Sequence, residues 1–243
     1  MLRSPYASDA IAAARDIGLS IGLHLDFVTH FVQDRSPLFG PHGKVCQVLF
    51  AHEIGREGPM HFSCFELIKV RDEMRCQIDD FIKLSGSLPS HLDYHYGLHH
   101  LSVAMALYLT IAEEYQLPVR WGEQYAGSNP YRLAPMAFCD QFHGQEQGGV
   151  ELFLSMVDQP CDGTKEIVCH PGFTTPGILP EAYNHGRELE LRTLTDTRLK
   201  EQLEQRQALL VNYDWLKAHI LSKNNYLSLE FCNHKGWSER DGA

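Results

Sequence analysis

Residues 19–27 read LSIGLHLDF, a compact apolar run with the length of a β-strand. The second half of this run contains two polar residues, His24 and Asp26. A second segment of this kind, SHLDYHYGLHH at residues 90–100, follows Pro89 and runs from a short strand into a histidine-rich loop. The two segments predict strands that carry functional side chains at their carboxyl ends.

Helical patterns separate these strands. Residues 66–86 form a predicted helix whose apolar side chains recur at three- and four-residue steps on one face, namely Leu67, Val70, Met74, Ile78, Phe81 and Ile82. A shorter helix is expected at 8–16, with Ser8 as its N-cap. Another helix at 101–116 leads into a strand that begins at 119–121.

The same alternation continues in the second half of the chain. Strands are predicted at 165–172 and 208–213, and helices at 150–159, 192–207 and 214–221. Such alternation is typical of parallel strands wrapped by helices, so we expect an α/β fold, either an open sheet or a β/α barrel. There is no internal repeat and no linker, and a single domain over 1–243 is therefore predicted.

The composition limits the classes of function. With 31 acidic and 21 basic residues the formal net charge is −10, which argues against a nucleic-acid partner. No stretch is apolar over about 18 residues and no signal-peptide pattern opens the sequence, so we expect a cytoplasmic protein without a membrane partner. The seven cysteines form no CxxC pair, which fits reduced and mostly buried thiols.

Three predicted strands end in a histidine motif: GLHLD, HLDYHYGLH and VCHPG. Because strand carboxyl ends meet on one rim, we expect His24, His95 and His170 to converge on one pocket. Two imidazoles and a carboxylate would form a divalent-metal site that polarises a carbonyl and activates water. His170, held by the Pro-Gly turn that follows it, could protonate a leaving amine.

Structural interpretations of these histidines stay open. His24 could be a hydrogen-bonded core residue and His170 an ordinary turn residue. In an extended segment residues 91, 93 and 95 face the same way, so only that alternating set can act together. His99 and His100 could contact substrate or lie exposed in the loop, and the second interpretation is favoured for His100.

Six segments occur in a characteristic order: GLHLD, PSHLDYHYGLH, LPVRW, DQFHG, VCHPG and YNHGRELELRTLTD. In this order, from residue 7 to residue 215, the chain resembles the YdjC-like carbohydrate deacetylases, a family that includes the chitooligosaccharide deacetylases. The resemblance implies a distorted β/α (TIM-like) barrel and a divalent metal, Mg²⁺ or Zn²⁺. It also implies a hydrolase that removes acetyl groups from N-acetylated sugars, with a homodimer compatible with this fold.

The resemblance also assigns roles to individual residues. It implies that His24 and His95 are metal ligands and that His170 is the catalytic acid. The positions expected to contact the substrate, or to lie in the shell around the site, are Arg120, Asp140, His99, Tyr183 and Arg187.

The sequence departs from the family pattern at its beginning. Family members open with a strand that ends in Asn-Ala-Asp-Asp-Phe-Gly, where one aspartate is the third metal ligand and its neighbour the base. Here GLHL begins at Gly22, so the expected barrel lacks its first strand and helix. A start codon assigned too far downstream is our preferred interpretation. The alternative is a catalytically impaired relative that binds sugar or metal.

Overall fold

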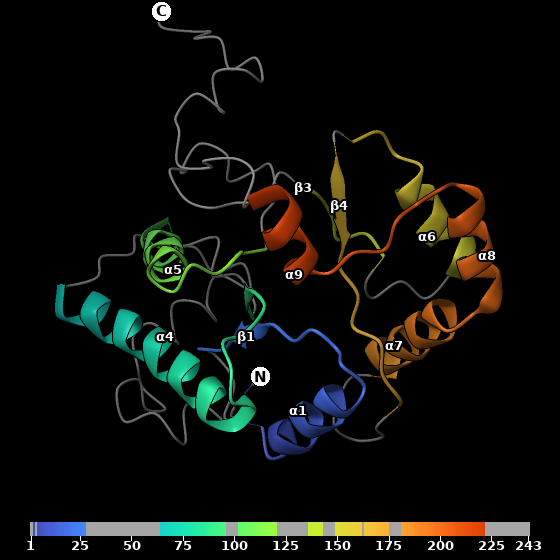
Figure 1. Ribbon diagram of the computed structural model, residues 1–243. Helices are drawn as coiled ribbons and strands as arrows, with labels where there is room; N and C mark the ends of the chain where they lie inside the picture. Colours follow the sequence, from blue (N-terminus) through green and yellow to red (C-terminus); the bar gives the residue numbers. More distant parts are fainter. Residues whose placement is uncertain are drawn as a thin grey trace, which may run out of the picture. The chain divides into compact units, whose positions relative to one another are not determined.

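The computed structural model is mixed α/β (Figure 1). It describes residue 2 and residues 4–27, 64–95, 102–120, 136–142, 149–161, 163–174 and 181–221. Contacts divide the chain into two compact units. The first contains residues 1–120, 128–134 and 212–243, and the second contains residues 121–127 and 135–211.

The first unit carries the strands expected to end in His24 and His95. Its elements are α1 (Ala7–Asp16), β1 (Leu23–Leu25), α4 (Cys64–Ser85), β2 (Leu92–Tyr94), α5 (Ser102–Glu114), α9 (Tyr213–Leu216) and a π-helical turn (Lys217–Leu221). β1 and β2 pair in parallel, with Leu23 opposite Leu92. Val119 forms a parallel bridge with Leu92, at the position where a third strand was predicted.

The apolar side chains of β1 and β2 lie in the core of the first unit. Leu23, Leu25 and Leu92 are fully or almost fully buried, and α4 packs against β1 with the apolar face predicted from its sequence. Val70, Met74, Ile78 and Phe81 of that face are buried. Tyr108 of α5, also buried, donates its hydroxyl proton to the carbonyl of Leu92 over 2.7 Å. This bond attaches α5 to the strand.

The second unit contains β3 (Met136–Cys139), β4 (Thr164–Ile167), α6 (Gly149–Val157), α7 (Glu181–Leu194) and α8 (Thr197–Gln205). β3 pairs in parallel with β4, and Cys139 lies opposite Ile167. The apolar faces of α6 and α8 meet in a separate core that includes Phe153, Leu154 and Leu199.

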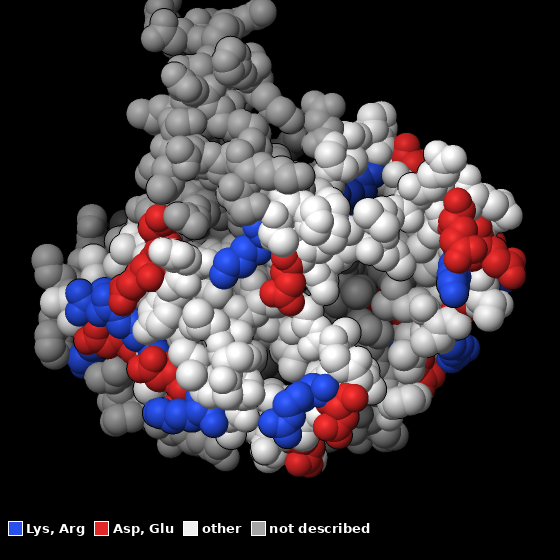
Figure 2. Space-filling view, viewed as in Figure 1, with Lys and Arg blue, Asp and Glu red and all other residues white. Residues whose placement is uncertain are grey.

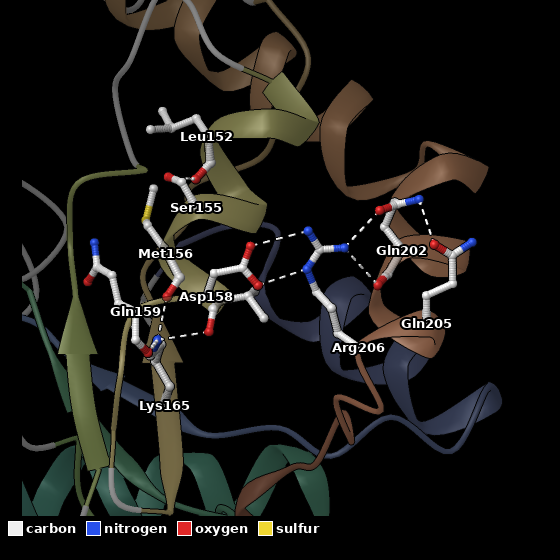
Figure 3. Close-up of polar contacts among 10 residues, drawn as sticks. Leu152, Ser155, Met156, Asp158, Gln159, Lys165, Gln202, Gln205 and Arg206 are labelled. Atoms are coloured by element: carbon white, nitrogen blue, oxygen red, sulfur yellow. Dashed lines mark hydrogen bonds and ion pairs between the residues drawn. The ribbon is translucent and has the colours of Figure 1, made fainter.

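Two basic side chains hold the end of α6 in place (Figure 3). Lys165 of β4 points its ammonium group at the last carbonyls of α6, those of Met156 and Val157, and at that of Gln159. A cation here satisfies carbonyls that have no partner within the helix. Arg206, directly after α8, binds Asp158 through two nitrogens, with its Nε 2.8 Å from Oδ1.

Several sequence predictions about the elements were wrong. The predicted helix 192–207 is interrupted because the side chain of Asp196 caps α8, accepting the Arg198 amide over 2.9 Å. The predicted strand 208–213 does not form, and Leu209 and Leu210 are 73% and 75% exposed. No strand in the described part of the chain pairs with this run, and an apolar run without a pairing partner gains little from the extended conformation.

Further corrections concern the ends of elements and single residues. Ser8 lies inside α1, which has Tyr6 at its N-cap and no side-chain cap. β3 was not predicted. Of the four cysteines whose side chains are described, Cys76 and Cys161 are exposed, so the expectation of mostly buried thiols does not hold for them.

The described strands form two parallel pairs, β1–β2 and β3–β4, as a β/α fold requires. The TIM-like barrel, and with it the single domain over 1–243, stay predictions. In Figure 2 acidic and basic side chains lie close to one another on the visible face. Ion pairs between described side chains include that of Arg75 with Glu114. None of the helices in the described ranges could cross a bilayer.

Candidate active site

The parallel register of β1 and β2 places His24 directly opposite Asp93. Side chains that are paired across two strands project from the same face, and the next residue on that face of β2 is His95. The main chain of His95 is fixed by a bond from its amide to the carbonyl of Leu25 over 2.7 Å. Two short strands therefore bring three polar side chains to one place.

His24 lies between two partners. Its Nδ1 is 2.7 Å from Oδ2 of Asp93, and its Nε2 is 3.2 Å from Nδ1 of His95. A carboxylate accepts only, so Nδ1 carries the proton in the neutral ring and Nε2 presents a lone pair. The rings of His24 and His95 meet edge to face, with their centroids 5.2 Å apart.

Both carboxylate oxygens of Asp93 have partners. Oδ1 accepts from the Tyr94 amide over 2.6 Å and from the Arg120 guanidinium over 2.6 Å, while Oδ2 faces His24. Burial on its own raises the pKa of this carboxyl. The bond and charge of His24, the charge of Arg120 and the Tyr94 amide outweigh it, and the net pKa is lowered. Asp93 is therefore an ionised residue that orients His24, with both oxygens engaged.

Arg120 connects the carboxylate to the rest of β2. Besides Asp93, its guanidinium donates to the carbonyl of Tyr94 over 3.1 Å and lies 5.3 Å from the centroid of the Tyr94 ring. Its own amide donates to Leu92 over 3.1 Å. Sequence reasoning placed Arg120 among the substrate or shell contacts. In the structure its guanidinium supports Asp93, which is a shell position.

His91, the first member of the alternating set 91, 93 and 95, lies beside Gly22. A Cβ atom at Gly22 would overlap the His91 ring, so glycine is what allows the imidazole to lie there. The ring stacks on Tyr213 of α9, with centroids 3.8 Å apart. Burial lowers the pKa of His91 to about 4, and the charge of Arg120 adds to this effect. His91 is therefore neutral at pH 7.

The third histidine motif lies in the second unit. His170 follows β4 in the segment 168–174, and its main chain is bound by Glu190 and Arg187 of α7. Burial, reinforced by the carboxylates of Glu190 and Glu166, raises the pKa of the neighbouring Cys169 thiol to about 11. Cys169 is thus protonated at neutral pH and is not a nucleophile.

The comparisons with known proteins agree with this pattern of motifs. The family model described as YdjC-like protein matches residues 1–205. The chain belongs to the YdjC-like family. A carbohydrate deacetylase of Vibrio parahaemolyticus serotype O3:K6 is 34% identical over 160 residues, which are 63% of this chain and 60% of the relative.

Two further members illustrate the range of the similarity. A chitooligosaccharide deacetylase of Serratia marcescens is 28% identical over 222 residues, which are 88% of this chain and 85% of that protein. A crystal structure from Enterococcus faecalis V583, provisionally described as a cellobiose-phosphate cleavage protein, is 26% identical with a TM-score of 0.63. It covers 88% of this chain and 85% of that chain.

The remaining positions carried over from the YdjC-like motifs are not all described. His99 lies outside the described residues, and Tyr183 lies in α7 where its side chain is not described. Asp140 is exposed immediately after β3. No three His, Cys, Asp or Glu side chains in the described ranges form a group that could hold a metal ion. The orienting role of Asp93 and the main-chain contact of Glu190 were not predicted from sequence. Alternation placed Asp93 on the same face as His95, but only the strand pairing shows that it lies opposite His24.

Proposed function

We propose that this chain is a metal-dependent hydrolase that removes acetyl groups from N-acetylated sugars or oligosaccharides of the chitooligosaccharide type. The observation that carries the proposal is the 3.2 Å separation between Nε2 of His24 and Nδ1 of His95. The names of the Vibrio and Serratia relatives support the substrate class.

The two nitrogens fit a shared cation. Imidazole nitrogens at about 2.0–2.1 Å from a tetrahedral zinc ion lie roughly 3.3 Å from each other. His24 and Asp93 also form the carboxylate–histidine pair that fixes the tautomer of metal ligands. Imidazole ligands suit zinc better than magnesium, so Zn²⁺ is the first cation to test and Mg²⁺ the second.

His24 and His95 would hold the cation, Asp93 would orient His24, and Arg120 would keep Asp93 ionised. When bound, a divalent cation supplies polarisation of the acetyl carbonyl and a lower pKa for water. In the hydrolysis a water oxygen bonds to the carbonyl carbon and its proton passes to solvent, the C–N bond breaks, and acetate leaves as the sugar amine takes up a proton. His170 is assigned the donation of a proton to the departing sugar amine, the role implied by its motif.

Acetate release from di-N-acetylchitobiose, measured with Zn²⁺ or Mg²⁺ present, tests this function. We expect turnover that is abolished by a chelator, restored by the cation and absent in H24A. Cation and sugar binding without acetate release would instead favour a catalytically impaired binding protein. No binding of either would refute both functions.

A further inference from the structure

The segment after β4 is bound along one side of α7. The amide of His170 donates to the carboxylate of Glu190, and the His170 carbonyl accepts from Nε of Arg187 over 3.2 Å. Arg187 and Glu190 are three residues apart and therefore lie on one helix face. Both polar groups of the His170 main chain are thus bound by two side chains from a single helical turn.

A second set of contacts fixes the following residues. The Gly172 amide donates to the main-chain carbonyl of Arg187 over 3.2 Å, and the Thr174 amide donates to Oε1 of Glu188 over 3.1 Å. A Cβ atom at Gly172 would overlap the guanidinium of Arg187. The glycine of the His-Pro-Gly motif is therefore the residue that lets the arginine approach the His170 carbonyl.

Glu190 and Glu188 differ in their surroundings. Glu190 is 1% exposed, whereas the side chain of Glu188 is 31% exposed and also binds Arg192. A bond from a main-chain amide to a buried carboxylate is strengthened by the low local dielectric and restricts the donor more than the same bond at the surface. The two glutamates of α7 are therefore a matched pair. Glu190 binds the amide of His170, and Glu188 binds the amide of Thr174.

We propose that Glu190 and Arg187 are positioning residues for His170 and act through its main chain, not through the imidazole or the substrate. The proposal rests on the function proposed above, in which His170 is the proton donor. It gives Arg187 a place in the shell around the site, because its Nε donates to the His170 carbonyl and its guanidinium lies against Gly172. Misplacement of a reacting group by about 1 Å can cost roughly 100-fold in rate.

The test compares E190A, E190Q and E188A in acetate release from di-N-acetylchitobiose. We expect E190A to lower kcat about 100-fold with KM changed less than about threefold, and the alkaline limb of its pH profile to become shallower. E190Q keeps an oxygen acceptor for the His170 amide and should recover most of kcat. E188A should match the wild type. Equal losses in E190A and E188A, or a change confined to KM, would overturn the proposal.

Histidine side-chain NMR separates this proposal from the proposed function. The His170 resonance, assigned by its loss in H170Q, should shift or broaden in E190A and in R187M and stay unchanged in E188A. An unchanged His170 signal in both E190A and R187M overturns the positioning role even if acetate is released. If the wild type releases no acetate, the function fails, and the NMR result still decides whether His170 is positioned. R187M serves where E190A does not fold.

Discussion

His24 lies directly opposite Asp93 in the parallel pairing of β1 and β2, and Nδ1 of the ring is 2.7 Å from Oδ2 of the carboxylate. This pairing fixes the tautomer of His24 and directs Nε2 toward His95. The strand register, more than either side chain alone, therefore determines where a cation could bind.

Removal of either proposed ligand should weaken cation binding strongly. H24A and H95A are each expected to weaken Zn²⁺ binding more than about 100-fold, because loss of an outer-shell partner alone costs about 10–100-fold. Isothermal titration calorimetry measures the affinity. H219A is the control, since His219 is exposed and its ring stacks on Trp215. Wild-type affinity in both ligand variants would refute the site.

The substitution D93N isolates the orienting carboxylate. Asparagine can still accept from Nδ1 of His24, but it carries no charge to support the ring or to pair with Arg120. We expect Zn²⁺ affinity about 10–100-fold below that of the wild type, a smaller loss than in H24A. Asp79, exposed on α4, provides the control D79N. A D93N affinity equal to that of D79N would contradict an orienting role.

His91 should make the protein less stable in mild acid. Its folded-state pKa of about 4 is lower than the ordinary 6.5, so between these values the unfolded chain binds a proton that the folded chain does not. The stabilising contribution of neutral His91 is fully present above about pH 6.5. Between that pH and pH 5 the free energy of unfolding falls by up to about 2 kcal/mol.

Urea unfolding at pH 7.5, 6.5 and 5 measures this loss, with H91Q as the comparison. The glutamine does not titrate, so the pH dependence of H91Q should be flatter over the same range. Identical slopes for H91Q and the wild type would show that other groups cause the acid sensitivity.

The substitution G22A should destabilise the first unit. The added methyl group would overlap the His91 ring, and forcing extra volume into a packed site costs about 1–3 kcal/mol. In the background of H91A the same methyl group has room, so its cost should largely disappear. Free energies of unfolding of the two single variants and the double variant form the required cycle. Additive costs would rule out the Gly22–His91 contact as the cause.

Local patterns in the sequence determined much of the secondary structure. The three- and four-residue spacing of Val70, Met74, Ile78 and Phe81 correctly predicted a long helix with one buried face. The apolar runs around His24 and Asp93 correctly predicted strands, because their alternation is a local property. The break at Asp196 was missed, since one capping side chain outweighed the helical propensity around it.

Contacts between distant segments were decided only by the tertiary structure. The sequence by itself supplied the histidine motifs, the family and the direction in which residues 91, 93 and 95 face. It did not fix which residue opposes His24, because that follows from the register of two strands 69 residues apart. Nor did it show that Glu190 and Arg187 bind the main chain of His170. Sequence spacing shows which residues share a helix face, but only tertiary packing decides which loop that face contacts.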